Sequence, residues 1–131
     1  MKKREYKKLH KKLNKLFMLW ITRLGLRWWK VSIHYVDDKK TIDKYFIKDD
    51  IHHTLAMAFS DWKYGNADIY VNMKDVQHRT DEELEEIVIH ECMHLLVNEM
   101  RAEGIDHEER VVTTLTRAVQ WTVADVEKKN A

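Results

Sequence analysis

The 131-residue sequence contains no proline, three glycines and one cysteine. A chain this poor in proline and glycine has no linker of the usual composition, and no repeat or low-complexity segment divides it. A single cysteine cannot form an internal disulfide, which is typical of proteins from a reducing compartment. We therefore expect one domain over residues 1–131, with one modest hydrophobic core.

The sequence also lacks a long apolar run. The longest run near the N-terminus, residues 16–21, is far shorter than the roughly 18 residues of a membrane span, and it is short even for a signal peptide. The content of 44% hydrophobic and 34% charged residues is that of a soluble globular protein. We expect a cytoplasmic protein that does not associate with a membrane.

The net charge is only +1, but it is distributed unevenly. Residues 1–15 contain eight Lys or Arg and one Glu, so the rest of the chain carries a net charge of −6. Apolar residues recur here at steps of three and four as far as Leu24, which predicts an amphipathic helix with a basic outer face. Such a face is usually only solvated. A nucleic acid or another anionic surface is the alternative partner, although the aromatic residues lie on the apolar stripe rather than among the lysines.

The pattern His-Glu-x-x-His is formed by His90, Glu91 and His94 within an apolar segment. On a helix, the two histidines lie one turn apart on the same face, so both imidazoles can reach one ion, and Glu91 projects beside them. Thr80 and Glu83 have the spacing of a capping box, which predicts that the helix begins there. Because the segment is apolar on nearly all sides, we expect it to be buried, where these polar groups need a partner. A metal ion is that partner in our interpretation, and a core helix with two hydrogen-bonded histidines is the alternative.

Cys92 lies inside the motif, and we interpret it as a small buried hydrophobic residue rather than a ligand. The remaining histidines before the final helix fit no ligand spacing, and we expect them at the surface or in turns. They are His10, His34, His52, His53 and His78.

Three segments before the motif have the composition and alternation of strands, namely residues 29–35, 54–62 and 67–72. The turn signal Gly65-Asn66 predicts that the second and third strands form a hairpin. Residues 37–40 have the composition of a turn, and residues 41–52 are ambiguous, with a short helix as one possibility.

After Gly104 the sequence predicts a final helix that Asp106 can cap. The apolar stripe of this helix is expected to consist of Val111, Val112, Leu115, Ala118, Val119, Val123 and Val126. The expected fold is therefore α+β, with an N-terminal helix, a small and mainly antiparallel sheet of about three strands, the metal helix and a C-terminal helix.

A catalytic zinc site takes three protein ligands, so the two histidines require a third. His107, Glu108 and Glu109 follow at the start of the final helix, which an antiparallel return would bring back to the metal helix. Helical projection places Glu108 nearest the middle of the apolar stripe. Glu109 lies to one side, and with Asp106 it has the spacing of a capping box. The residues by themselves leave the three candidates open.

His90-Glu91-Cys92-Met93-His94, followed by the segment 107–112, resembles the motif of small zinc metallopeptidases of phages and prophages, of the gluzincin type of zincin. The likeness in motif covers about residues 80–121, with a looser likeness in layout before it. The resemblance implies Zn²⁺ as cofactor and Glu109 as the third metal ligand beside His90 and His94. It also implies that Glu91 is the catalytic general base and that a peptide or protein is the substrate.

In zincins, the strand before the metal helix borders the cleft and binds the extended substrate, so the resemblance implies that residues 67–72 form the edge strand. The longer metzincin pattern with a third histidine is absent. No tyrosine or histidine can be assigned to stabilising the oxyanion from the motif, and His107, Tyr64 and Tyr70 are candidates.

We therefore expect a zinc-dependent metallopeptidase in which a metal-activated water attacks the peptide bond. The alternative comes from a different class of protein, a binding or regulatory module in which zinc only stabilises the fold. Its motivation is the small size of the chain, which leaves little room for the walls of a specific cleft. Nucleic-acid binding through the basic N-terminal helix can coexist with either function.

Overall fold

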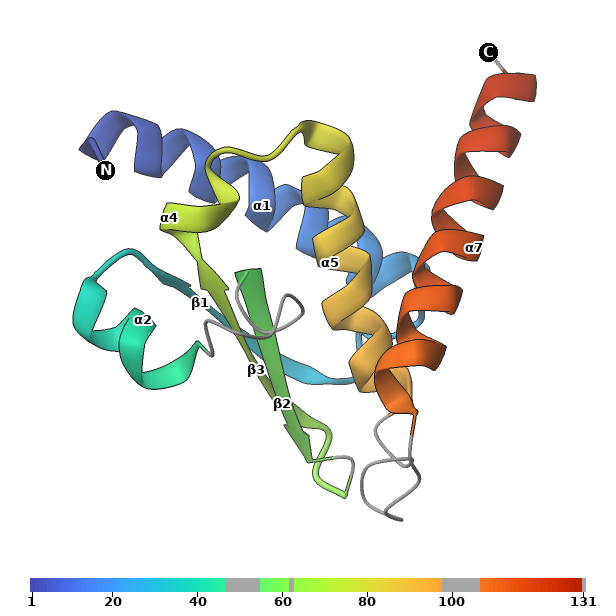
Figure 1. The fold of residues 1–131 in the computed structure, drawn as a ribbon. Coiled ribbons are helices and arrows are strands. Elements are labelled where there is room, and N and C mark those ends of the chain that lie inside the picture. The colour runs from blue at the N-terminus through green and yellow to red at the C-terminus, as the bar shows by residue number, and fades with distance from the viewer. Residues whose placement is uncertain (47–54, 62, 98–106, 131) are drawn as a thin grey trace.

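The structure is a computed structural model that describes residues 1–46, 55–61, 63–97 and 107–130. The fold is α+β, as the sequence predicts, and the order of its elements matches the expected layout (Figure 1). The elements are α1 (Lys3–Arg23), β1 (Lys30–Val36), α2 (Lys39–Tyr45), β2 (Ala56–Asp61), β3 (Asn66–Asn72), α4 (Met73–Val76), α5 (Asp81–Leu96) and α7 (Glu108–Asn130). None of the helices in these ranges has the length and apolar character needed to cross a membrane.

The three strands form one mixed sheet in the order β1-β3-β2. β2 and β3 are antiparallel, which confirms the expected hairpin, with Ala56 opposite Val71. β1 and β3 are parallel, with Lys30 opposite Asn66, so the expectation of a mainly antiparallel sheet is only half right. β3, the last of the three strands in the sequence, therefore lies between β1 and β2.

This strand order corrects the expectation about the edge of the sheet. β3 is the central strand, so residues 67–72 are not available to an extended ligand. Among the described residues, β2 pairs only with β3 and is therefore an edge strand. The order of strands depends on pairing between distant segments, which the alternation within one segment does not reveal.

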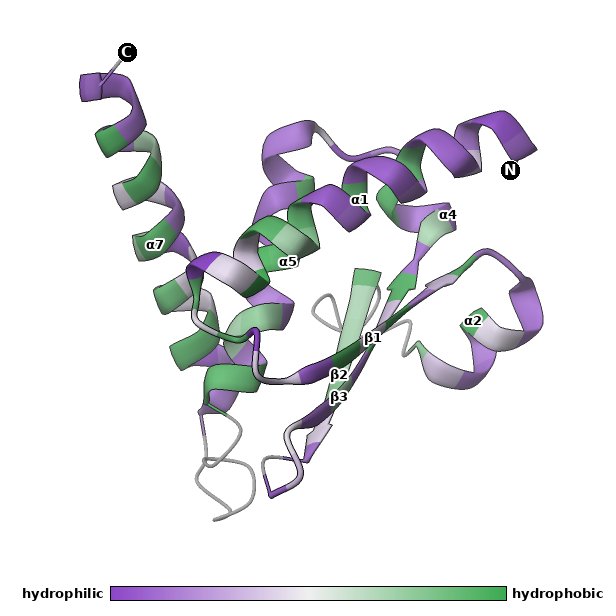
Figure 2. Cartoon of the chain, turned by 180° about the vertical axis from the view of Figure 1, so that it is seen from behind, coloured by the Kyte–Doolittle hydropathy of each residue, from purple (hydrophilic) through white to green (hydrophobic). Residues whose placement is uncertain are grey.

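One face of the sheet packs against helices, and α5 lies at the centre of this arrangement. It contacts α1, β2 and α7, and Figure 1 shows it between the sheet and α7. The side chains at the centre of this layer are fully buried, and they include Phe17 and Trp20 of α1, Ile69 of β3, and Val88 and Ile89 of α5. In Figure 2 the N-terminal end of α1 is hydrophilic, whereas the middle of α5 is hydrophobic. α5 is therefore held rigidly by the core.

The start of α5 is the capping box that the sequence predicts. The Thr80 hydroxyl accepts a hydrogen bond from the Glu83 backbone N–H at 3.2 Å, and the Thr80 backbone N–H donates to the Glu83 carboxylate at 3.4 Å. Together with a side-chain bond from Arg79, these contacts hold the pKa of Glu83 below its usual value. The Trp20 indole N–H donates to Glu85 at 3.2 Å and ties α1 to the same end of α5.

α2 occupies part of the region that the sequence left ambiguous. The expected turn at residues 37–40 is instead the start of this helix, because the Asp38 carboxylate accepts the Thr41 backbone N–H at 2.8 Å as an N-cap. Much of the rest of the ambiguous region, residues 47–52, lies outside the described residues.

The expected apolar stripe of α7 is only partly right, because Val112, Val119 and Val123 pack against the core but the other members do not. Val112 and Thr116 are buried, whereas Leu115 and Val126 are 38% and 50% exposed. Ala118 is also exposed. The helix packs mainly on α5, with an ion pair from Glu127 to Arg23 of α1 at 3.2 Å, so only a narrow stripe is covered, and it is turned toward Thr116 rather than Leu115. The expected cap, Asp106, lies outside the described residues.

Candidate metal centre

Two imidazoles lie next to each other near the C-terminal end of α5. The rings of His90 and His94 have centroids 5.0 Å apart and meet edge to face. The His94 side chain is 5% exposed and that of His90 is 14% exposed. The one-turn spacing expected from the motif therefore places both rings at the interface with α7, beneath its first turn.

Glu109 completes a group of three around one point. Its carboxylate oxygens lie 2.8 Å from Nε2 of His94 and 3.2 Å from Nε2 of His90. Each of the three residues offers one ligand atom, and these atoms lie within 4.8 Å of one another. Within the part of the chain that the structure describes, this is the one group of at least three His, Cys, Asp or Glu side chains that can hold a metal ion.

The other two candidates for a third ligand are placed differently. Glu108 lies 3.5 Å from Nδ1 of His94, the nitrogen on the opposite side of the ring from Nε2. His107 is exposed and adopts a left-handed backbone with φ 75. The buried stripe of α7 explains this arrangement, because Glu108 and Glu109 lie on either side of the line through Val112 and Thr116. The structure thus brings Glu109 to Nε2 of both histidines and Glu108 to Nδ1 of His94.

The donor set fits zinc. Two imidazole nitrogens and one carboxylate oxygen are a ligand set known from catalytic zinc sites, which keep a fourth position open. In the structure the carboxylate interacts with both imidazoles directly. Burial raises the pKa of Glu109, but the hydrogen bonds from the two histidines outweigh burial and lower it below its usual value. Burial lowers the pKa of His94, but the bond to Glu109 and the charge of Glu91 outweigh it, so the pKa is raised.

Glu91 is 3% exposed and lines a cleft beside His90. The cleft has a volume of about 230 Å³, and β2, α5 and α7 form its walls. Leu55 and Ala56 contribute from the start of β2, and Arg117 contributes from α7. The catalytic carboxylate predicted from the motif therefore faces a cleft that the edge strand also borders.

Sequence reasoning did not find the part of the cleft that α7 supplies. Thr113 and Arg117 line it, one and two turns after Glu109 on the same side of the helix. Arg117 Nε lies 3.9 Å from the Glu86 carboxylate of α5. Their spacing from Glu109 is the signal that would have identified them once that residue was chosen as a ligand.

The remaining candidates lie away from the centre. Cys92 is fully buried, and burial, with a smaller effect of the Glu91 charge, raises the pKa of its thiol to about 12, so it has the character of a core residue. Tyr64 is 77% exposed. Tyr70 stacks on the outer face of the sheet, between the rings of His34 at 4.5 Å and Tyr45 at 4.7 Å. Neither tyrosine lines the cleft beside Glu91.

Among the described residues, the histidines outside the motif are not part of the candidate centre. His34 Nε2 lies 2.9 Å from the carboxylate of Asp68. His10 packs against the ring of Tyr35 with centroids 4.2 Å apart, and His78 is exposed. Residues 52 and 53 lie outside the described residues.

Comparisons with known proteins found no relative of this chain. No model of a known protein family matches the chain. No curated protein and no solved structure matches it either. The chemistry of the site is therefore argued from its own geometry.

Proposed function

We propose that the protein is a zinc-dependent metallopeptidase in which His90, His94 and Glu109 hold the metal and Glu91 is the general base. One observation supports this most strongly: two imidazole Nε2 atoms and a carboxylate converge, and a second, buried carboxylate lies beside them in a cleft. A purely structural zinc site usually has four protein ligands and needs neither the extra carboxylate nor the cleft.

The three proposed ligands leave a bound zinc ion with a net positive charge. Two neutral imidazoles and one carboxylate balance only half the charge of a divalent ion. When bound, zinc supplies Lewis acidity, which lowers the pKa of water and polarises a carbonyl oxygen. Because α5 is fixed by the core on several sides, it presents both histidines in a constant geometry.

Glu91 is placed to move protons. It takes a proton from the attacking water and passes it to the amine that leaves. Its carboxylate is on the same helix as the two histidines, and its position directly after His90 directs it into the cleft. Burial around it excludes bulk water, which strengthens electrostatic interactions with a bound substrate.

The edge strand β2 is the element that an extended peptide would pair with. Its first residue, Ala56, and the preceding Leu55 line the same cleft as Glu91, and its outer edge has no partner strand among the described residues. Backbone hydrogen bonds along such an edge bind a peptide in an extended form. The role that the resemblance implied for residues 67–72 thus passes to β2 in this proposal.

The test is hydrolysis of a peptide library by the zinc-loaded chain, read by mass spectrometry, for the parent and Glu91→Gln. Parent activity that a chelator removes, and that Glu91→Gln lacks while it keeps its zinc, is the expected result. Glu86→Gln is the matched control, because it removes another carboxylate from the same cleft without touching the centre. Cleavage by Glu91→Gln at the parent rate would refute the role of Glu91. Zinc binding without any cleavage by the parent would favour a binding module instead.

A further inference from the structure

We infer that the outer face of α1 binds the phosphate backbone of a nucleic-acid duplex. Four exposed cations lie along this face, at steps of four, three and four residues: Arg4, Lys8, Lys11 and Lys15. Residues with this spacing share one side of a helix. The opposite side of α1 carries Leu13, Phe17 and Trp20, which are buried in the core. We call these four residues the α1 stripe.

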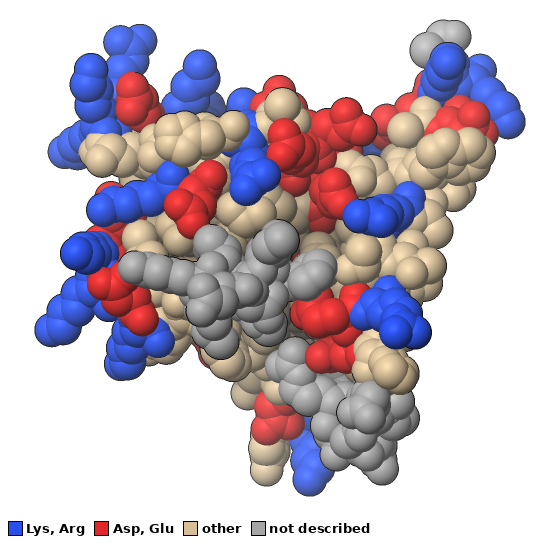
Figure 3. Space-filling model, in the orientation of Figure 1, with Lys and Arg blue, Asp and Glu red and all other residues tan. Residues whose placement is uncertain are grey.

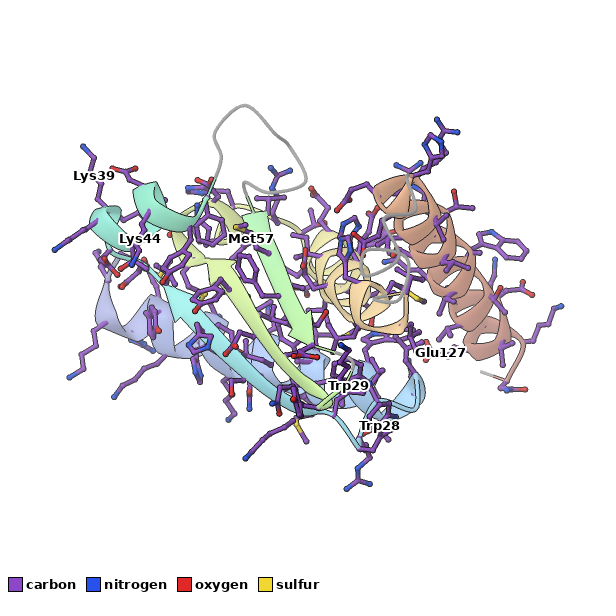
Figure 4. All side chains as sticks on the ribbon, turned by 90° about the horizontal axis from the view of Figure 1, so that it is seen from below. Trp28, Trp29, Lys39, Lys44, Met57 and Glu127 are labelled. Atoms are coloured by element: carbon purple, nitrogen blue, oxygen red, sulfur yellow. The ribbon has the colours of Figure 1, made fainter. Side chains whose placement is uncertain are left out.

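The charge of the α1 stripe is not neutralised within the fold. Of the cations in residues 1–15, only Lys12 forms an ion pair among the described residues, with Asp81 at 2.7 Å. Further exposed cations lie on α2 and α4. They are Lys39, Lys40, Lys44 and Lys74, but Asp37, Asp38, Asp43 and Asp75 lie among them, so the excess of positive charge lies on α1. Figure 3 shows Lys and Arg gathered over the N-terminal half of α1 and along the side of the molecule formed by α2. Figure 4 places Lys39 and Lys44 on the side of the sheet away from α7.

The acidic residues are concentrated elsewhere. α5 has six Asp and Glu residues and no Lys or Arg, so the molecule has a basic helix, α1, and an acidic helix, α5. Such an asymmetric field orients a polyanion toward the basic side. The candidate metal ligands lie near the C-terminal end of α5 and at the start of α7, away from the N-terminal half of α1 (Figure 1).

The chemistry of the surface favours a duplex over a membrane. An amphipathic helix that binds a bilayer must insert its apolar face. The apolar face of α1 is instead buried against α5, with Leu13 and Phe17 fully covered. Met18 and Leu19 are exposed near the C-terminal end of α1, but the α1 stripe itself presents only charge. Its array of point charges along about 16 Å of helix axis matches the regular phosphates of a duplex.

The outer face of α1 lacks the exposed aromatic side chains that base recognition or a protein interface needs. Single-stranded nucleic acids stack on exposed aromatic faces, and protein interfaces have aromatic anchors. The aromatic residues of α1 lie on its inner side, and Trp20 is only 1% exposed. On the open face of the sheet, Tyr70 has both ring faces covered by His34 and Tyr45. We therefore expect binding through phosphates, without sequence preference.

The experiment is fluorescence anisotropy of a labelled 20-base-pair DNA duplex with the full chain, over 50 to 200 mM salt. If the four cations of the α1 stripe each contact a phosphate, the slope of log K against log salt should be about −3.6, a loss of about 150-fold over this range. The stripe variant replaces Arg4, Lys8, Lys11 and Lys15 with Gln. It should lose most of this slope and bind at least about 50-fold more weakly at 50 mM salt.

The matched control removes the same number of charges at exposed positions elsewhere, by replacing Arg27, Lys63, Lys128 and Lys129 with Gln. It should keep the slope, and circular dichroism should show that both variants are folded. Equal losses in the two variants would overturn the inference, because net charge rather than the stripe would then control binding. Binding to anionic phospholipid vesicles without binding to the duplex would overturn it as well. The outcome is independent of zinc, so His90→Ala should bind the duplex like the parent even if the proposed peptidase function fails.

Discussion

Zinc binding should stabilise the fold, because the ligands come from two helices. His90 and His94 belong to α5, and Glu109 belongs to the first turn of α7. At a free zinc concentration of 100 times Kd, linkage adds about 2.7 kcal/mol to the free energy of unfolding. For 131 residues, the entropy of unfolding near Tm is about 0.28 kcal/mol/K, so Tm should rise by about 10 °C.

The two neighbouring glutamates should differ in their effect on this shift. Glu109→Gln removes one of three ligands, and a loss of affinity on the order of 100-fold leaves about 0.4 kcal/mol, or about 1.5 °C, at the same zinc concentration. Glu108→Gln keeps an acceptor oxygen near Nδ1 of His94. Changing such an outer partner costs about 10-fold in affinity, which leaves about 1.4 kcal/mol, or about 5 °C.

The assay is thermal unfolding of each variant with and without zinc, followed by circular dichroism. Each variant is compared with its own metal-free form, because Glu109 lies within 3.2 Å of both histidines and its replacement alters stability by itself. A full 10 °C shift in Glu109→Gln together with a lost shift in Glu108→Gln would show that Glu108 is the ligand. No shift in the parent would show that the centre does not bind zinc, and the proposed function would fall with it.

Other predictions concern the fold. Glu83→Gln should lower Tm at pH 7, because the pKa of this carboxyl in the folded state lies below its usual value of about 4.5. Its stabilising effect is present above about pH 4.5 and is lost as the pH falls through the folded pKa, so the Tm difference from the parent should vanish in acid. Val112→Ala should lower the free energy of unfolding in urea by about 1 to 3 kcal/mol, because this side chain is fully buried between α7 and α5. Leu115→Ala should lower it by less than about 0.5 kcal/mol, and the reverse order would contradict the observed stripe. Gly65→Ala should cost about 1 to 2 kcal/mol, since φ is +63 and a Cβ would lie 3.0 Å from the Trp28 ring; a neutral effect on unfolding would contradict this turn geometry.

The local features of this protein follow from its sequence alone. The extent of α1, the capping box at Thr80 and the pairing of β2 with β3 depend on residues a few positions apart. For the same reason, His90 and His94 had to lie on one face of a helix. Periodicity and capping chemistry operate over one or two turns, so the sequence shows them directly.

Tertiary structure decided the features that join distant segments. It made β3 the central strand and β2 the edge, because a parallel partner 36 positions earlier in the chain occupies the other side of β3. It also turned α7 so that Thr116 rather than Leu115 faces α5, and this rotation places Glu109, not Glu108, at Nε2 of both histidines. A helix that packs against one neighbour can rotate by some tens of degrees with little change in buried apolar area, so its hydrophobic pattern does not determine which of two adjacent carboxylates faces inward.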